Sequence, residues 1–223
     1  MTTRFSGTPG ATPAPVVLVL ASGLGRRFRA SGGQVHKLQA LLAGRPVLER
    51  TLDAVRASGL PWHLEDAGHP GMGDSIAAAV RATSAAPGWL VLPGDLPLVQ
   101  PATLRAVAAA LAQADVVLPW CQGVRGHPVG FSARCGAALM ALAGEEGASS
   151  IVRQWQVEGR VLRWDTADTG CITDIDTTDD LARAEALWQA QATPGARAPD
   201  DRTSAPGPQA AGHATHPGEC GCQ

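Results

Sequence analysis

Small and cationic residues follow directly behind a short apolar segment near the start of the chain. Residues 16–20 read VVLVL, and ASGLGRR comes immediately after them, with a lysine further on. Glycine lets backbone N–H groups approach a ligand closely, and arginine and lysine side chains offset the negative charge of phosphate groups. This combination predicts a binding site for a nucleoside triphosphate. The residues predicted to form it are Ala21, Gly23, Gly25, Arg26, Arg27 and Lys37.

This glycine loop differs from the two most familiar nucleotide-binding patterns. No Gly-Lys-Ser/Thr follows it, as a Walker loop requires, and the G-x-G-x-x-G pattern fails because Arg26, Arg27 and Phe28 come after Gly25. Short glycine motifs also occur by chance, so an ordinary polar loop with surface arginines is the alternative interpretation of this segment alone. Other stretches of the chain must decide between the two.

Two acidic points could hold a cation beside such a triphosphate. Asp95 follows the apolar segment 89–92, and open α/β sheets place their ligands at the carboxyl ends of strands. Mg²⁺ binds a few protein oxygens and completes its shell with phosphate oxygens and water, so Asp95 is a predicted metal ligand. Asp174 and Asp176 alternate along the chain, and at most one faces a given side if the segment is extended; one of them is the second predicted ligand. The alternatives are a turn-forming Asp95 and helix-capping roles for the later pair.

Strands and helices alternate along the chain in a way that would position these residues. Apolar runs predict strands at 16–20, 89–92, 116–118 and 161–164, with a weaker one within 61–67. Helical spacing and cap signals predict helices at 47–57, 71–81, 101–111, 137–143, 149–157 and 177–191. The glycines and prolines of 123–131 predict a tight loop. The alternation predicts a mostly parallel, three-layer α/β/α domain.

The composition is that of one globular domain. Of 223 residues, 45% are hydrophobic and 17% are charged, which suffices for one sizeable core but hardly for two. We predict a flexible segment over 1–15, a domain over 16–191 and a disordered tail over 192–223, because the tail lacks apolar periodicity. The tail contains residues that could bind a metal, namely His213, His216, Cys220 and Cys222. Their spacing does not match a standard zinc site.

Charge and cysteine usage exclude several classes of partner. The formal net charge is -2, with acids and bases mixed along the chain, which argues against a nucleic-acid-binding face or a polybasic membrane patch. The N-terminus lacks the pattern of a secretory signal, and no segment has the length of a transmembrane helix. Five scattered cysteines without a paired framework fit a reducing cytoplasm. We therefore expect small-molecule partners and a cytoplasmic location.

Six short motifs follow one another along the chain. They are LASGLGRRF (20–28), Lys37, GMGDS (71–75), GDLP (94–97), GHPV (126–129) and DIDT (174–177). Taken together they resemble the MobA-like nucleotidyltransferases, most closely the molybdenum cofactor cytidylyltransferase branch, and six motifs in the right order are far more specific than any one. The resemblance implies a Rossmann-like domain that transfers CMP from CTP to the phosphate of molybdopterin carrying molybdenum. It also implies release of pyrophosphate and a requirement for Mg²⁺.

The resemblance implies roles for individual residues as well. Those that would hold the triphosphate are Gly23, Gly25, Arg27 and Lys37. Those that would lie near the base and sugar are Gly73 and Ser75. The metal would be held by Asp95 together with Asp174 or Asp176, and the residues that would face the pterin are Gly126, His127 and Pro128. Judged from its loop alone, the histidine could equally be a structural residue that fixes the chain path.

Departures from the family pattern leave the substrate open. Residues 29–36 delay Lys37, and Ser149 stands where the family often has an arginine that could touch an anionic substrate. By the family resemblance, Ala21 and the GMGDS motif favour cytidine over guanosine. The alternatives to cytidylyl transfer are a transferase that uses another nucleoside triphosphate or another phosphorylated acceptor, and a non-catalytic chaperone that holds the molybdenum cofactor for a client molybdenum hydroxylase.

Overall fold

A seven-stranded sheet forms the centre of the protein, whose computed structural model describes residues 13–192. The strand order is β4-β1-β5-β8-β6-β7, and β9 pairs with β6. The strands are β1 (Val16–Leu20), β4 (Trp62–Glu65), β5 (Gly88–Pro93), β6 (Val116–Cys121), β7 (Val124–Arg125), β8 (Val129–Ser132) and β9 (Val161–Asp165). The predictions for residues 1–12 and for the tail from 193, with its histidines and cysteines, lie outside the described residues.

The predicted mostly parallel sheet is confirmed. Strand β1 pairs in parallel with β4 on one side and with β5 on the other. Strand β8 lies antiparallel between β5 and β6, and β6 pairs in parallel with β9. The strands β1, β4, β5, β6 and β9 therefore all run in one direction, which brings the carboxyl ends of β1 and β5 side by side.

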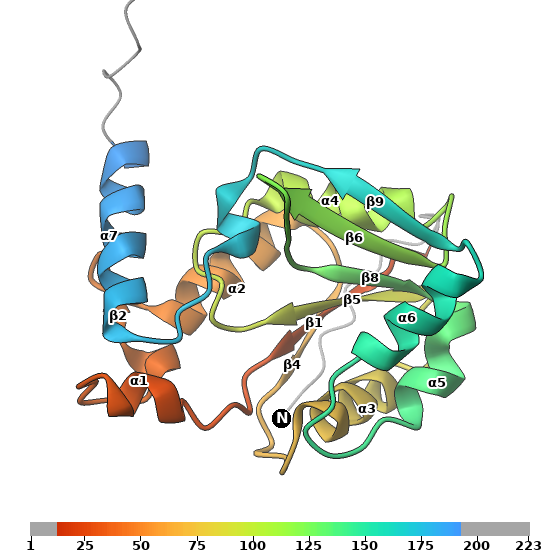
Figure 1. Ribbon diagram of the computed structural model, residues 1–223, viewed down its shortest axis with the longest axis horizontal. Coiled ribbons are helices and arrows are strands. Elements are labelled where there is room, and N and C mark those ends of the chain that lie inside the picture. Colours follow the sequence, from red (N-terminus) through yellow and green to blue (C-terminus); the bar gives the residue numbers. More distant parts are fainter. Residues whose placement is uncertain (1–12, 193–223) are drawn as a thin grey trace, which may run out of the picture. The chain divides into compact units, whose positions relative to one another are not determined.

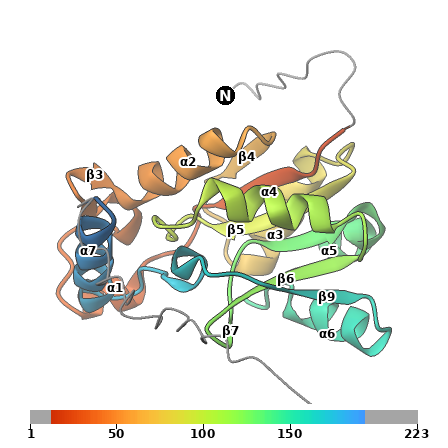
Figure 2. The same ribbon diagram turned by 90° about the horizontal axis from the view of Figure 1, so that it is seen from above.

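Helices cover both faces of the sheet, as Figures 1 and 2 show. They are α1 (Arg26–Ala30), α2 (Val47–Ser58), α3 (Met72–Ala82), α4 (Pro101–Ala110), α5 (Gly136–Met140), α6 (Ser149–Val157) and α7 (Thr178–Ala192). In β1, Leu18 and its alternate neighbours pack with α3, α5 and α6, whereas Val17 and Val19 pack with α2 and α4. Because successive strand residues point to opposite faces, the fully apolar β1 supplies both layers of the core.

A third apolar cluster anchors the segments that carry the charged residues. The hairpin of β2 (Leu41–Leu42) and β3 (Arg45–Pro46) joins α1 and α7 at one end of the sheet in both views. The buried side chains of this third cluster include Phe28, Leu38 and Ile175. Since Leu38 adjoins Lys37 and Ile175 adjoins Asp176 in sequence, burial of these apolar neighbours positions both charged residues.

The expected loop at 123–131 is wrong in part. Residues 124–125 and 129–132 form β7 and β8, and β8 inserts between β6, which closely precedes it in sequence, and the distant β5. Gly130 permits this, because a Cβ there would lie 2.9 Å from Cγ1 of Val107 on α4. The short α1 was also missed, and the helix expected at 137–143 ends at Met140. Within the described residues, no helix has both the length and the apolarity needed to cross a bilayer.

Asp115 ties together the far end of the sheet, and its loss should destabilise the fold. Its carboxylate accepts hydrogen bonds from Ser132 (2.7 Å) and Arg160, and Arg134 lies 3.7 Å away. Burial acts to raise the pKa of Asp115, but these three partners outweigh it and hold the pKa below its usual value. We expect Asp115→Asn to lower the free energy of unfolding by about 1–3 kcal/mol at pH 7.

The pH dependence of that loss follows from the lowered pKa. A carboxylate with a depressed folded-state pKa stabilises the protein above its unfolded pKa, and this contribution disappears as the pH falls through the folded pKa. Urea unfolding of the wild type and Asp115→Asn should therefore differ at pH 7 and converge below pH 3.8, the ordinary pKa of an aspartate. Equal stability of the two proteins at pH 7 would contradict this role.

Candidate active site

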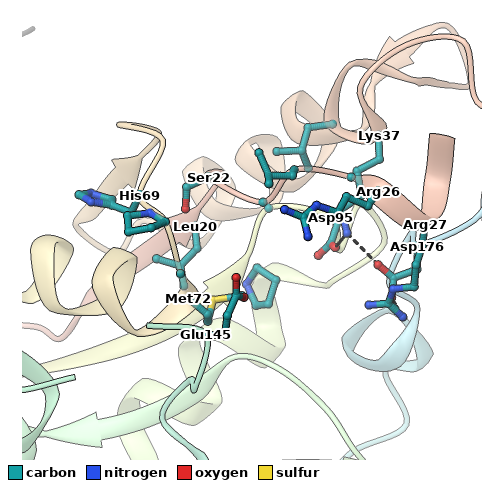
Figure 3. Close-up of a pocket in the computed structure, with 18 residues that line it drawn as sticks. Leu20, Ser22, Arg26, Arg27, Lys37, His69, Met72, Asp95, Glu145 and Asp176 are labelled. Carbon is teal, nitrogen blue, oxygen red and sulfur yellow. Dashed lines mark hydrogen bonds and ion pairs between the residues drawn. The ribbon is translucent and has the colours of Figure 1, made fainter. Parts of the chain in front are cut away.

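An open pocket of about 410 Å³ lies at the carboxyl ends of β1 and β5 (Figure 3). It is lined by the glycine loop, by Lys37, by the segment after β5 and by the start of α3. Of the residues predicted from sequence, those that line it are Gly23, Gly25, Arg26, Arg27, Lys37, Asp95 and Asp176. Figure 3 shows Asp95, Arg27 and Asp176 at one end of the pocket and His69 and Met72 at the other.

The glycine loop is held in place by His36. Its Nδ1 accepts a hydrogen bond from the N–H of Leu38 (3.3 Å), so its Nε2 carries the proton and donates to the carbonyl of Gly23 (2.7 Å). Gly25 has a φ of 59°, a left-handed conformation that favours glycine, and leads directly into α1. The segment 29–36, which delays Lys37, thus returns to the loop and pins it.

The carboxyl ends of β1 and β5 lie close together, and this brings Asp95 beside the glycine loop. The N–H of Gly94 donates to the carbonyl of Leu20 (2.9 Å), and a Cβ at Gly94 would lie 3.0 Å from that oxygen. The hydroxyl of Thr51 in α2 donates to the carbonyl of Gly94 (2.9 Å). Glycine before Asp95 therefore allows the chain after β5 to lie against the end of β1.

Three segments meet at one cluster of charges. Lys37 Nζ lies 2.5 Å from Asp95 Oδ2 and 2.8 Å from Asp176 Oδ1. Arg27 Nη1 lies 2.7 Å from Asp176 Oδ2. The N–H of Ile175 donates to the carbonyl of Asp95 (3.0 Å) and holds the two acidic segments together. The cations near the first strand and the acid after a later strand thus share one cleft.

The electrostatics of this cluster keep Lys37 charged. Burial acts to lower the pKa of Lys37, but the carboxylates of Asp95 and Asp176 outweigh it and raise the pKa above its usual value. One oxygen, Asp95 Oδ1, is buried and has no hydrogen-bond partner among the described residues. A buried carboxylate oxygen without a partner is costly, so this atom is suited to a ligand cation.

The donor set fits a hard divalent ion. Asp95 and Asp176 present carboxylate oxygens toward one point, and Asp95 has an oxygen to spare. No group of three His, Cys, Asp or Glu side chains could form a complete metal cage within residues 13–192. Two carboxylates without a full cage match Mg²⁺, which takes its remaining ligands from substrate phosphates and water.

Asp174 occupies a different position from Asp176. It does not line the pocket, and its side chain is part of an exposed residue. Partial burial and the negative charges of Asp95, Asp176 and Asp180 raise the pKa of Asp174. Asp176 is therefore the member of the later pair that shares Lys37 with Asp95.

Three other predicted nucleotide-binding residues do not line the pocket but contact the segments that form it. Ser75 is buried and its Oγ lies 2.5 Å from Oγ of Ser22, which does line the pocket. A Cβ at Gly73 would lie 2.7 Å from the carbonyl oxygen of Glu146, so Gly73 lets the start of α3 pack against the loop before α6. The N–H of Ala21 donates to the carbonyl of Glu65 (2.8 Å).

The GHPV motif belongs to a second, smaller pocket of about 190 Å³. His127 lines it, whereas Gly126 and Pro128 are buried and do not. A Cβ at Gly126 would lie 2.6 Å from Sγ of Cys171, and the N–H of His127 donates to the carbonyl of Cys171 (2.9 Å). Burial of the ring and the charge of Arg125 lower the pKa of His127 to about 4, although Asp95 acts in the opposite direction, so the ring is neutral at pH 7.

Several residues of the site were not singled out from the sequence, among them His36, which does not line the pocket but holds the glycine loop. His36 had a usable signal, because it stands directly before Lys37. The others line the pocket, lie outside the motifs named above and come from segments whose proximity depends on the fold; they are Leu38, His69, Pro70, Pro93 and Glu145. Patterns in a single sequence could not have predicted that Glu145 lies near the start of α3.

Comparisons with known proteins identify a relative among curated proteins. The bifunctional protein GlmU of Bordetella parapertussis is 32% identical over 130 residues. The match covers 46% of this chain and 28% of GlmU, so the chain spans less than a third of that protein. GlmU of Bordetella bronchiseptica matches to the same extent.

Solved structures share the fold. Rv0371c from Mycobacterium tuberculosis H37Rv superposes with a TM-score of 0.63 at 23% identity, covering 79% of this chain and 99% of that one. A nucleotidyl transferase from Methanothermobacter has a TM-score of 0.65 at 20% identity, with coverage of 80% and 99%. Molybdopterin-guanine dinucleotide biosynthesis protein A from Archaeoglobus fulgidus has a TM-score of 0.53 at 19% identity, with coverage of 78% and 99%. A complex of Rv0371c with manganese also matches, with a TM-score of 0.58 at 23% identity, covering 78% of this chain and 98% of that one.

A family model provides the most direct assignment. Residues 54–159 match the MobA-like NTP transferase domain. The match includes Asp95 and the GHPV motif, whereas the glycine loop and Asp176 lie outside it. These outer segments converge on Asp95 in the structure, and the fold agrees with that of the solved relatives. Residues 54–159 of this chain are therefore similar to the MobA-like NTP transferase domain.

Proposed function

We propose that this protein is a nucleotidyltransferase that transfers CMP from CTP to the phosphate of molybdenum-carrying molybdopterin and releases pyrophosphate. One observation carries the proposal: Lys37 lies between Asp95 and Asp176 at the mouth of a glycine loop. Cations and paired carboxylates that share a pocket suit a triphosphate together with a divalent ion. The family match to an NTP transferase domain supports the same class of reaction.

The glycine loop and its cations are proposed to hold the triphosphate. Arg26 and Arg27 are exposed at the pocket, where their guanidinium groups can reach phosphate oxygens without first leaving a buried site. Lys37 lies deeper, with its side chain 13% exposed, and it faces the end of the pocket that holds both carboxylates. This depth suits contact with the phosphates between which the bond is broken.

Asp95 and Asp176 are proposed to hold the divalent ion. The related fold of Rv0371c has been solved in complex with manganese, which supports an ion of this class, and Mg²⁺ is the ion we propose here. When bound, such an ion would neutralise charge on phosphate oxygens. Asp95 Oδ1 and Asp176 Oδ1 are the oxygens best placed for it, since the first is unpartnered and the second contacts only Lys37.

The transfer itself needs no nucleophile from the protein. An oxygen of the acceptor phosphate attacks the α-phosphorus of CTP, forming a P–O bond, and the bond between the α-phosphorus and its bridging oxygen breaks with both electrons passing to pyrophosphate. The protein must bring two anions together and stabilise the charge that builds on the leaving group. Arg27 and Lys37 are the side chains placed to do so.

The end of the pocket near His69 and Met72 is proposed to hold the base and sugar. It lies away from the charged cluster in Figure 3, and Ser22 is fixed there by Ser75. Ala21 and the GMGDS motif support cytidine as the base, through the family resemblance. The product, a cytidine dinucleotide form of the cofactor, would then pass to a client molybdenum hydroxylase.

Pyrophosphate release tests the proposal directly. The purified protein is supplied with CTP, GTP, ATP or UTP and Mg²⁺, with and without molybdenum-carrying molybdopterin. We expect release with CTP only, and only when the pterin is present. Release that requires a different phosphorylated acceptor or a different nucleotide would support the proposed transferase activity but contradict the proposed substrate. Pterin binding without release from any nucleotide would instead support a chaperone.

Removal of the His36 side chain should loosen the glycine loop. His36→Ala deletes the hydrogen bond to the Gly23 carbonyl, and one such bond contributes about 1 kcal/mol. We expect the Kd for CTP, measured by calorimetry, to rise about fivefold. Gln34→Ala serves as the control, because its amide donates only to Gly32 nearby and does not touch the loop. An unchanged Kd in His36→Ala would show that the loop holds its shape without this contact.

A further inference from the structure

Two segments that are distant in sequence carry the two carboxylates of the charged cluster and contact each other along their length. The first, residues 95–103, runs from Asp95 into α4, and the second, residues 168–176, ends at Asp176. At one end of the contact, the N–H of Ile175 donates to the carbonyl of Asp95 (3.0 Å). The relative position of the two carboxylates therefore depends on how these segments are held together.

The middle of the contact leaves no room for a side chain. Gly170 lies in a short 3₁₀ helix, η3 (Thr169–Ile172), and a Cβ there would lie 1.9 Å from the carbonyl oxygen of Leu98. Only glycine lets the two backbones approach this closely. The spacing of the segments is thus set by direct contact at Gly170 as well as at Ile175.

A buried carboxylate, that of Asp168, closes the other end of the contact. Its Oδ2 accepts hydrogen bonds from the backbone N–H of Gln100 (2.9 Å) and from the hydroxyl of Thr103 (2.6 Å). Its Oδ1 accepts one from the N–H of Gly170 (2.9 Å). Asp168 is 5% exposed and Thr103 is 2% exposed, so water competes little for these bonds. One side chain therefore binds both segments.

The negative charge of Asp168 suits the start of α4. Gln100 is the N-cap of this helix, and its side chain makes no capping hydrogen bond. The carboxylate of Asp168 lies there instead, at the positive end of the helix dipole, where a negative charge is stabilising. Within residues 13–192, the lining of the proposed nucleotide pocket does not include Asp168. Any effect of Asp168 on the site must therefore pass through the segments that it joins.

We propose that Asp168 is a positioning residue for the divalent ion, because it fixes the separation of the segments that carry Asp95 and Asp176. The inference rests on the proposed metal site, and it adds a residue that does not contact the ion. Mg²⁺ binds oxygens only within a narrow range of distances, about 2.0–2.1 Å, so ligands from two segments bind it well only when the segments are held in register. Substitution of residues that orient metal ligands commonly weakens metal binding about 10- to 100-fold.

Binding of Mn²⁺ to the free protein, measured by electron paramagnetic resonance, tests the inference without turnover. Asp168→Asn keeps the size of the side chain but replaces one acceptor oxygen with a donor. Thr103→Val replaces only the hydroxyl that donates to Asp168 with a methyl group. We expect each of these variants to raise the Kd for Mn²⁺ about tenfold or more. Thr103→Ser retains a hydroxyl and should bind Mn²⁺ nearly as well as the wild type.

Asp115→Asn is the matched control for a loss of stability. Asp115 is another buried carboxylate with polar partners, namely Ser132, Arg134 and Arg160, but it lies at the far end of the sheet. Its substitution should destabilise the fold and leave the Kd for Mn²⁺ at the wild-type value. All of the proteins are titrated well below their melting temperatures, so that each is folded during the measurement.

Pyrophosphate release supplies a second readout. Asp168→Asn should need about tenfold more Mg²⁺ for half-maximal release, whereas its KM for the nucleotide at saturating Mg²⁺ should be unchanged. Binding of Mn²⁺ by the wild type without release from any nucleotide would refute the proposed function and leave this inference intact. The inference would be overturned by a wild-type Kd for Mn²⁺ in both Asp168→Asn and Thr103→Val, or by an equal loss of binding in Asp115→Asn or Thr103→Ser. Absence of Mn²⁺ binding by every protein would overturn it as well.

Discussion

Asp95→Asn should lower the rate of nucleotidyl transfer on the order of 10²-fold or more at saturating Mg²⁺, the size of effect seen when a principal electrostatic group is removed. The amide keeps the shape of the side chain but loses its negative charge. It would face Lys37 Nζ, which lies 2.5 Å from Asp95 Oδ2, and would present a neutral group where the buried Oδ1 has no partner. The proposed metal site would thus lose half of its charge.

The same substitution should leave the fold intact. The backbone contacts that position Asp95 come from its own carbonyl and from Gly94, and an amide at this side chain disturbs neither. Lys37 also keeps Asp176 as a partner. The melting temperature of Asp95→Asn should therefore stay close to that of the wild type.

Pyrophosphate release and calorimetry together check this expectation. Asp165→Asn is a suitable control, because Asp165 is exposed on β9 and pairs only with Arg163. The control should retain the wild-type rate. If Asp95→Asn also retained that rate, Asp95 would not be a metal ligand.

The approach of the glycine loop to Asp95 could be anticipated because both directly follow strands that local patterns predict. An apolar run such as β1 predicts a buried strand, and carboxyl ends of parallel strands meet at one edge of a sheet. Pairing of β1 with β5 then places the glycine loop beside Asp95. This part of the site was predictable because it requires only strand identity and direction.

The choice between Asp174 and Asp176 could not be made in the same way. Alternation predicts that the two side chains diverge, but it does not say which one faces the pocket. That depends on the burial of Ile175 beneath α1 and α7 and on its N–H bond to the carbonyl of Asp95. Both are contacts between segments far apart in the sequence.

The second pocket was largely hidden from sequence reasoning for a related reason. Strand β8 has four residues, one of them glycine, and its pairing with β5 and β6 is long-range. Without the pairing of β7 with β6, Arg125 is one charged residue in a glycine-rich stretch. The sheet is what turns it into the cation of a pocket shared with Ser149 of α6.

Lys37→Met should abolish most activity and also destabilise the protein. Its ammonium group bridges two carboxylates whose side chains are 12% and 19% exposed, so its removal leaves two negative charges facing each other with little water between them. Breaking a largely buried pair in this way costs about 3 kcal/mol of unfolding free energy. Loss of the cation that would face the leaving pyrophosphate should lower the transfer rate by roughly 10²-fold or more.

Mg²⁺ should have different effects on the stability of the two proteins. In Lys37→Met the ion can neutralise Asp95 and Asp176, so the melting temperature should rise more on adding Mg²⁺ than it does in the wild type, where Lys37 already bridges them. The rate should remain low, because the metal restores the charge balance of the carboxylates but not the contact with phosphate.

Lys37→Arg tests the geometry: it keeps the charge, yet a planar guanidinium differs in shape from the ammonium held at 2.5 and 2.8 Å, so only partial activity is expected. An Mg²⁺ response identical in Lys37→Met and the wild type would show that the two carboxylates do not form a cation site.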